Sequence, residues 1–463
     1  MKVEKQFKRT VKAGLILFAA GLLLGAVIVY AVTPSSTFYI SNGIYPGAPS
    51  FTIWTEDSNY FAKDANGELK YSGTNASLII QNALDAMGQH GILFLRDGVY
   101  LITSRIYMSG NNIWLRGESW KTILRRETEF GNHLITTDLT DWQHDIHISD
   151  LTIEDILTNS ELVSSVYMEK LQNVIVERLN ITNPRCHGIE LNDVKNARVS
   201  DCIVTGSGAN YASYQIDGTN DDDRSEHQVW ERLVSVNSGG SGIDFHNYGH
   251  HDIVARDCVI ISPSAEGFRS QSTIGEYTDI SIIDNWIYNA SKGISLKDLK
   301  SGKINGNHIF NTSSIGIEVL GVNYDTDPAK DFTIIANDIR DCAGTGIAIT
   351  YSKNFRVAEN HVENCSGKQI GILGCYNGTV SENILITPAT QIGIRLYEGT
   401  DQCKGIILLG NIIRGASIGI QESHTSDYNV IVSCDTRTCT TGITTVGANT
   451  KVNLSWNASS WIS

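Results

Sequence analysis

Two stretches of the chain, starting 30 residues apart, share one pattern of residues. Residues 307–320 read NHIFNTSSIGIEVL and residues 337–350 read NDIRDCAGTGIAIT, so each begins with Asn and has Gly-Ile nine residues later. Pairs of Gly with an apolar residue recur about every 25 residues from Gly188 to Gly442, and Asn or Cys precedes most of them by about nine residues. A short unit repeated in this way is typical of a solenoid, in which each unit packs on its neighbours.

Each unit contains three short stretches in which apolar and polar residues alternate. Three strands per turn, stacked about 4.8 Å from the next turn, form a right-handed parallel β-helix. The sequence therefore predicts an all-β, single-stranded solenoid of about 11–13 coils. Inside it, we expect apolar columns, glycines with dihedral angles that other residues avoid, and a ladder of hydrogen-bonded side chains at one bend. The expected ladder residues are Asn180, Cys202, Cys258, Asn285, Asn307, Asn337, Asn360, Asn383, Asn411 and Cys434.

The N-terminal part divides by composition. Residues 1–12 are basic, and we expect them to be cytoplasmic. Residues 13–32 contain no charge and, as a helix, would be about 30 Å long, which predicts a transmembrane anchor or uncleaved signal with an extracellular remainder. The alternative is a cleavable signal peptide, which would make the protein secreted. Residues 33–50 are then a linker, residues 51–140 the N-terminal cap and first coils, and residues 141–463 the parallel β-helix.

A helix is predicted over residues 77–90, where apolar residues recur at helical spacing between an Asn or Ser cap and a Gly stop. It would cover the open end of the coil, where strand edges are unpaired. The runs ASLIIQNAL (76–84), GILFLRDGVY (91–100) and IWLRGESWKTIL (113–124) resemble the opening of pectate-lyase-superfamily β-helix proteins. That resemblance implies the fold and an extracellular carbohydrate context. It implies no single reaction, because the superfamily includes lyases, hydrolases, epimerases, tailspikes and non-catalytic surface proteins.

The charge of the chain argues against one class of partner. With 50 acidic and 36 basic residues, the formal net charge is −14. An acidic surface repels phosphate backbones, so we expect no nucleic-acid partner. The expected partners are a polysaccharide or cell-envelope glycan, and a membrane through residues 13–32.

Ionisable side chains concentrate on a few adjacent turns of the predicted coil. In the strands that begin at Gly-Ile, alternate residues point outward, and those of successive turns lie about 4.8 Å apart. Acids, a base and cations then fall on neighbouring turns. The candidate catalytic residues are Glu190, Asp217, Asp244, His246, Arg269 and Lys297.

Three reactions fit these residue types. An inverting hydrolase needs two carboxyl groups about 6.5–9.5 Å apart, for which Asp217 with Asp244 or Glu190 are candidates. A uronate lyase or epimerase needs a base, such as His246 or Lys297, and a cation to neutralise the substrate carboxylate, such as Arg269 or a bound Ca²⁺.

Calcium prefers oxygen ligands, and Asp221, Asp222 and Asp223 are the candidates to hold it. The same acidic run also fits a solvated loop. We therefore expect an extracellular protein that binds a polysaccharide and cleaves or epimerises it. The alternative is a non-catalytic surface adhesin or envelope structural protein, because a row of mixed charges is also what a solvated sheet presents.

Overall fold

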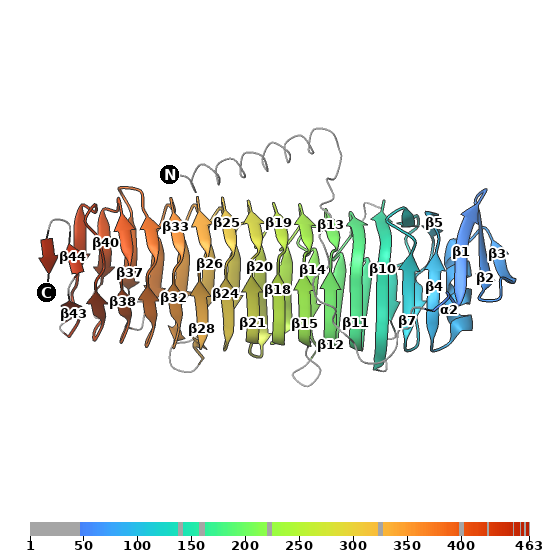
Figure 1. Ribbon diagram of the computed structural model, residues 1–463, viewed down its shortest axis with the longest axis horizontal. Helices are drawn as coiled ribbons and strands as arrows, with labels where there is room; N and C mark the ends of the chain where they lie inside the picture. The colour runs from blue at the N-terminus through green and yellow to red at the C-terminus, as the bar shows by residue number, and fades with distance from the viewer. Residues whose placement is uncertain are drawn as a thin grey trace. The chain divides into compact units, whose positions relative to one another are not determined.

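The computed structural model describes residues 47–137, 142–156, 163–219, 225–322, 327–397, 402–423, 426–447, 449–453, 455–457 and 460–462. The chain divides into two compact units, Met1–Gly43 and Ile44–Ser463, and all described residues belong to the second. This unit is an all-β, right-handed parallel β-helix of about 13 turns (Figure 1). The predicted β-helix is confirmed.

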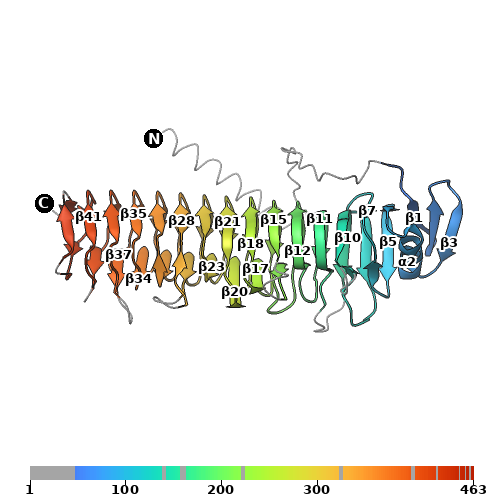
Figure 2. The same ribbon diagram turned by 90° about the horizontal axis from the view of Figure 1, so that it is seen from below.

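Each turn contributes strands to three faces, which the chain visits in a constant order, and strands of successive turns pair in parallel (Figure 2). Face 1 contains β1 (Phe51–Glu56), β4 (Gly91–Leu95), β7 (Ile113–Gly117), β10 (Gln143–Asp155), β11 (Val166–Thr182), β12 (Ile189–Ser200), β15 (Glu226–Glu231), β18 (His251–Arg256), β21 (Thr278–Ile283), β24 (Gly302–Asn305), β28 (Phe332–Ile335), β32 (Arg356–Ala358), β35 (Thr379–Ser381), β38 (Ile407–Leu409), β41 (Val430–Val432) and β43 (Lys451–Asn453). The long strands β10, β11 and β12 each continue across two or three faces.

Face 2 follows face 1 in every turn. Besides parts of β10 and β11, it contains β5 (Gly98–Ile102), β8 (Thr122–Arg126), β13 (Ile203–Thr205), β16 (Val234–Val236), β19 (Val259–Ile261), β22 (Trp286–Tyr288), β25 (His308–Phe310), β29 (Asp338–Arg340), β33 (His361–Glu363), β36 (Ile384–Ile386) and β39 (Ile412–Arg414).

Face 3 completes the turn and contains the strands that the Gly-Ile pairs predicted. Besides parts of β11 and β12, it contains β6 (Ile106–Met108), β9 (Ile135–Thr137), β14 (Tyr214–Asp217), β17 (Ile243–Tyr248), β20 (Phe268–Ile274), β23 (Ile294–Lys297), β26 (Ile317–Leu320), β30 (Ile347–Thr350), β34 (Ile370–Leu373), β37 (Ile392–Tyr397), β40 (Ile418–Glu422) and β42 (Thr441–Thr444). Its inward residues stack in register, as Ile243, Phe268 and Ile294 do, and they are fully buried.

Short strands lie beside these faces. β2 (Asn59–Asp64) and β3 (Leu69–Gly73) extend β1 as an antiparallel meander, β27 (Ala329–Lys330) pairs with β31 (Ser352–Lys353), and β44 (Ser455–Asn457) pairs with β45 (Ser460–Ile462).

The bend between faces 1 and 2 carries the predicted asparagine ladder. From Asn285 to Asn411, each side-chain amide donates to the Oδ1 atom of the next asparagine at 2.9 Å. Each amide also donates to a face 1 carbonyl, so the buried polar atoms of the bend are paired. The prediction of Asn180 as a ladder residue is wrong by one position. Leu179 is the buried residue that pairs with Leu151 at this position.

The repeated glycines have a different role from the one expected. Gly242, Gly267, Gly293 and Gly316 do not have positive φ angles. Instead they allow close approach between turns, because a Cβ atom at Gly293 would lie 2.5 Å from the carbonyl oxygen of Gly316. The pair Gly371-Ile372 is not part of the series, since Gly371 pairs with the outward Ala348.

The N-terminal end is covered by α2 (Ala76–Met87). The side chain of Asn75 accepts a hydrogen bond from the Leu78 amide at 3.1 Å and caps the helix. Gly88, with φ of 65°, ends it. The helix buries its apolar side against β1, β2 and β3, as the predicted cap requires.

The predicted transmembrane helix over residues 13–32 lies outside the described residues. Within the described ranges, α2 has 12 residues, which corresponds to about 18 Å. No helix there is long and apolar enough to cross a bilayer. A membrane span needs about 20 mostly apolar residues. The predicted fold class is therefore corrected for the described residues, which form a parallel β-helix with an α-helical cap and contain no helix that could span a membrane.

Candidate functional site

Two rows of side chains run across the outer surface of face 3, where ladder pairing places equivalent residues of successive turns side by side. Row 2 lies two residues further along each strand than row 1. Row 1 consists of Tyr167, Glu190, Gln215, Asp244, Arg269 and Ser295, and row 2 of Glu169, Asn192, Asp217, His246, Gln271 and Lys297.

Asp244 joins two partly exposed ionisable groups of the site. Its side chain is 1% exposed, whereas those of His246 and Arg269 are 31% and 25% exposed. Arg269 donates from Nε to Asp244 Oδ1 at 3.0 Å and from Nη2 to Oδ2. His246 Nδ1 lies 3.4 Å from Asp244 Oδ2. A bidentate arginine and a histidine thus share one buried carboxylate.

The three groups set each other's ionisation. Burial alone would raise the pKa of Asp244, but the bonds from His246 and Arg269 outweigh it and hold the pKa below its usual value. The hydrogen bond to Asp244 raises the pKa of His246. The pKa of Arg269 is also raised, since its bonds to Asp244 outweigh its burial. Asp244 therefore stays ionised and orients both neighbours.

Asp217 is held by hydrogen bonds from its own surroundings. Its Oδ1 atom accepts from the Gly218 amide at 2.7 Å and from Asn247 Nδ2 at 2.8 Å, and its Oδ2 atom accepts from Gln215 Nε2 at 3.0 Å. These donors fix the orientation of the carboxylate beside row 1.

Glu190 is the acid of the site whose proton is retained near neutral pH. Burial raises its pKa to about 7, against an opposing hydrogen bond from Ser164, and the charge of Asp217 adds to the increase. Ser164 Oγ donates to Glu190 Oε2 at 2.5 Å. A protonated carboxyl group here can act as a general acid.

Comparisons with known proteins bear on the fold that carries these rows. The family model described as the right-handed beta helix region matches residues 323–437. Tailspike protein 3 of bacteriophage CBA120 is similar in structure, with a TM-score of 0.60, 16% identity, and coverage of 78% of this chain and 59% of the tailspike. The chain thus spans less than two thirds of that tailspike.

The A-module of mannuronan C-5 epimerase AlgE4 from Azotobacter vinelandii matches with a TM-score of 0.52 and 15% identity, over 82% of this chain and 96% of the module. None of the curated proteins matches the chain by sequence. This chain is a right-handed parallel β-helix protein. The resemblance to pectate-lyase-superfamily β-helix proteins is confirmed at the level of the fold.

The fold does not bring every candidate residue into the cluster around Asp244. Lys297 lies on β23, one turn beyond Arg269, and its backbone amide donates a hydrogen bond to Ser270 Oγ at 2.6 Å. No side-chain hydrogen bond joins Lys297 to Asp244. Asp221, Asp222 and Asp223 lie outside the described residues. In the described ranges, no group of three or more His, Cys, Asp or Glu side chains is placed to hold a metal ion.

The fold also places here residues that are not among the six candidates. His250 and Tyr277 bond to the carbonyl groups of His246 and Phe245, at 3.0 and 2.8 Å, and so support the strand that carries the base. Tyr167 lies beside Glu190 in row 1, because Val166 pairs with Ile189. The signal was present in Ser165-Val166, which takes the place of a Gly-Ile pair.

Proposed function

We propose that face 3 binds a polyuronate and that His246 removes the proton next to a uronate carboxylate, in a lyase or epimerase reaction. The observation that carries the proposal is the arrangement around Asp244, which is buried and leaves a base and a cation exposed side by side. Proton abstraction next to a carboxylate needs these two groups. We further propose that the protein meets its polysaccharide outside the cell.

The same arrangement argues against hydrolysis through Asp244. An inverting hydrolase needs a carboxylate that can reach a water molecule beside the sugar. Asp244 is 1% exposed and its oxygen atoms are engaged by Arg269 and His246. Its role is therefore that of a positioning residue.

The steps balance with the residues present. His246 Nε2 takes the proton from the carbon next to the carboxylate, while Arg269 stabilises the negative charge that develops on the carboxylate. In elimination, the electron pair forms a carbon–carbon double bond, the glycosidic C–O bond breaks, and Glu190 protonates the leaving oxygen. In epimerisation, Glu190 donates a proton to the opposite side of the same carbon, no bond to oxygen breaks, and Glu190 regains its proton from water.

The fold supports a polymer as the substrate. The similar epimerase module acts, by its name, on mannuronan, which is a polyuronate. Rows 1 and 2 extend over successive turns, and strands of neighbouring turns lie about 4.8 Å apart. An extended surface of this kind is suited to a chain of sugars rather than to a single one.

The test is solvent-proton exchange on polymannuronate and polygalacturonate in deuterated water. Epimerisation replaces the proton next to the carboxylate with deuterium, whereas the lyase reaction removes that proton and yields an unsaturated product. We expect His246→Gln to lower the rate by about 10²-fold or more, and Arg269→Gln to lower it by about 10²-fold. His227→Gln is the matched control, because His227 is an exposed histidine of face 1. The proposal is contradicted if the wild-type protein yields neither deuterium incorporation nor an unsaturated product with either polymer.

A non-catalytic binding protein is the second candidate. It is favoured by the internal pairing of Asp217 and Asp244, which leaves both carboxylates satisfied without a substrate. This function predicts retention of a polyuronate by the wild-type protein with no exchange and no unsaturated product. Loss of that retention in Arg269→Gln would then assign the binding to face 3.

A further inference from the structure

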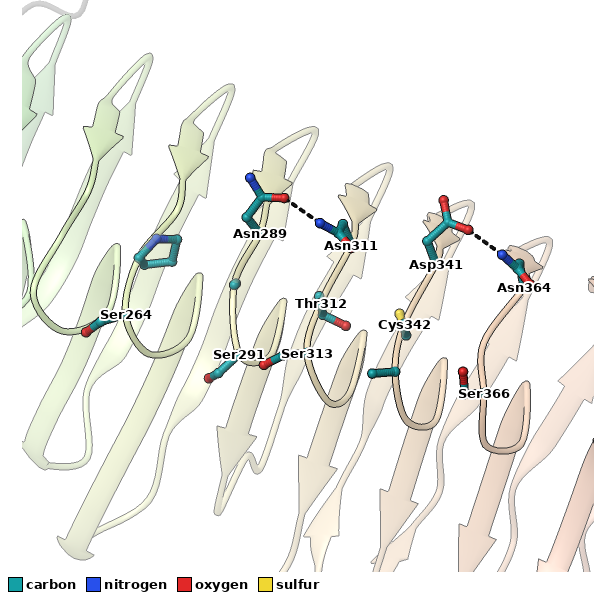
Figure 3. Close-up of a pocket in the computed structure, with 13 residues that line it drawn as sticks. Ser264, Asn289, Ser291, Asn311, Thr312, Ser313, Asp341, Cys342, Asn364 and Ser366 are labelled. Atoms are coloured by element: carbon teal, nitrogen blue, oxygen red, sulfur yellow. Dashed lines mark hydrogen bonds between the residues drawn. The ribbon is translucent and has the colours of Figure 1, made fainter.

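A shallow groove lies on the turns that lead from face 2 to face 3, on the C-terminal side of the candidate site. It has a volume of about 530 Å³ and is lined by residues of five successive turns, from Pro263 to Ser366. Figure 3 shows its lining residues. None of the six candidate catalytic residues lines it.

The lining repeats a short unit from turn to turn. Three turns contribute an Asn-small-Ser tripeptide, at 289–291, 311–313 and 364–366, and a fourth contributes Asp341-Cys342-Ala343. The first residue of each unit has a φ of 55–58°, a conformation that Asn and Asp adopt more readily than most residues. The side chains therefore recur at the spacing of the turns, about 4.8 Å.

The amide and carboxylate groups of the groove order one another. Asn311 Nδ2 donates to Asn289 Oδ1 at 2.7 Å, and Asn364 Nδ2 donates to Asp341 Oδ1 at 2.6 Å (Figure 3). Figure 3 shows these side chains in one row, with serines along the loops beside them. The groove thus presents polar side chains whose orientation is already set by these hydrogen bonds.

The serines retain unused hydrogen-bonding capacity. Ser313 and Ser366 are exposed and Ser291 is half-buried. Their hydroxyl groups form no side-chain hydrogen bond within the residues that the structure describes. Each hydroxyl can donate one hydrogen bond and accept two, which matches a ligand rich in hydroxyl groups.

The charge of the lining selects between classes of polymer. Asp341 is the one charged side chain among the lining residues, and no Lys or Arg lines the groove. An anionic polymer would gain no cation here and would meet a carboxylate. The lining complements a neutral ligand, in contrast to the site around Arg269.

Aromatic side chains border the groove on face 2. Tyr288 and Phe310 immediately precede Asn289 and Asn311, and their ring centroids are 5.3 Å apart in a stacked pair. Trp286 stacks on His308 at 4.1 Å and is 37% exposed. Such rings supply apolar surface for the C–H faces of sugars beside the polar groups that bind hydroxyls.

We propose that this groove is a second glycan-binding site and that it takes a neutral polysaccharide. The inference goes beyond the proposed function, because it concerns other residues and a ligand of different charge. The polymer would lie across the turns with its hydroxyl groups on the Asn and Ser side chains.

The test is affinity electrophoresis of the full chain in gels that contain a soluble glucan, a mannan or polymannuronate. We expect the glucan or the mannan to retard the wild-type protein. Ser313→Leu fills the groove and removes a hydroxyl, and Trp286→Ala removes apolar surface. Each should weaken the affinity by about tenfold.

Two control variants assign the binding to the groove. Thr390→Leu makes the same kind of change on an exposed turn outside the lining, and His246→Gln alters the candidate site on face 3. Both should bind the neutral polymer as the wild-type protein does, and all variants should keep the thermal transition of the wild type. The proposal is overturned if neither neutral polymer retards the wild-type protein, if Ser313→Leu binds as tightly as Thr390→Leu, or if only polymannuronate binding is lost in Ser313→Leu.

Discussion

Glu190 and Asp244 are carboxylic acids of the same row, and their surroundings shift their pKa values in opposite directions. Burial raises the pKa of Glu190 to about 7. Asp244 is also buried, but the hydrogen bonds from His246 and Arg269 lower its pKa. A pair of acids separated in this way can divide the roles of proton donor and fixed negative charge.

The raised pKa of Glu190 predicts a pH-dependent stability. The unfolded acid titrates near 4.5 and the folded one near 7, so the folded state holds a proton that the unfolded state has lost. The free energy of unfolding therefore falls by up to ~3 kcal/mol as the pH rises from about 4.5 to above 7. Glu190→Gln cannot lose this proton and should be more stable than the wild type at pH 8.

Thermal unfolding across this pH range measures the effect. The melting temperatures of Glu190→Gln and the wild-type protein should converge at pH 4, where both side chains are neutral. Glu129→Gln is the control, because Glu129 is exposed and should show no such divergence. If the melting temperatures of Glu190→Gln and the wild type differed by the same amount at all pH values, folding would not raise the pKa of the Glu190 carboxyl group.

The strands of face 3 show how one element imposes a residue type on the next. Each inward Ile or Phe stacks on its equivalent, and the residue before it lies against a carbonyl group of the following turn. A Cβ atom at Gly316 would lie 2.5 Å from both Gly346 O and Ile339 Cγ2. Contacts this short require the turns to move apart, so glycine is needed for close approach.

Two glycines that look alike in sequence should therefore tolerate alanine differently. Gly316→Ala should lower the free energy of unfolding by about 1–3 kcal/mol, because the added methyl group overpacks the joint between turns. Gly371→Ala should change it by less than about 0.5 kcal/mol, because the nearest atom to its Cβ lies 3.5 Å away. Urea unfolding of both variants measures the difference, and equal effects would refute the assigned register.

On the scale of the whole described coil, the end of the stack needs protection. Strands within the coil pair on both sides, whereas a terminal turn has an unpaired edge and an open apolar interior. α2 and the β2–β3 hairpin lie at this end (Figure 1). Leu84 is buried on the inner side of α2, and Leu78 is 55% exposed on its outer side.

The two leucines provide a matched test of the cap. Leu84→Asp would bury a carboxylate, and we expect it to lower the free energy of unfolding by about 3 kcal/mol or more. We also expect it to produce aggregate in size-exclusion chromatography that the wild-type protein does not form, since the open end can pair with other chains. Leu78→Asp should leave both properties as in the wild type. Aggregation of both variants alike would point to solubility rather than capping.

The candidate site could be predicted in part. Along the strands after Gly188, Gly242 and Gly267, side chains alternate between inward and outward, so the sequence identified the outward residues. The repeat then placed these residues on neighbouring turns. Tyr167 was missed because Ser165-Val166 does not carry the glycine of the repeat. The error at Asn180 had another origin, since a shift of one residue from Leu179 to Asn180 leaves the spacing to Gly188 almost unchanged.

The sequence by itself determined the coil, its cap and most of its register, because these depend on local periodicity and on which residues can stack or turn. Only the tertiary structure decided that Asp244 is buried under His246 and Arg269 and that Glu190 retains a proton near pH 7. It also decided that residues of five turns, four of which contribute a serine, share one groove. Burial and ionisation depend on what lies across a turn, and residues that meet there are about 25 positions apart in the chain.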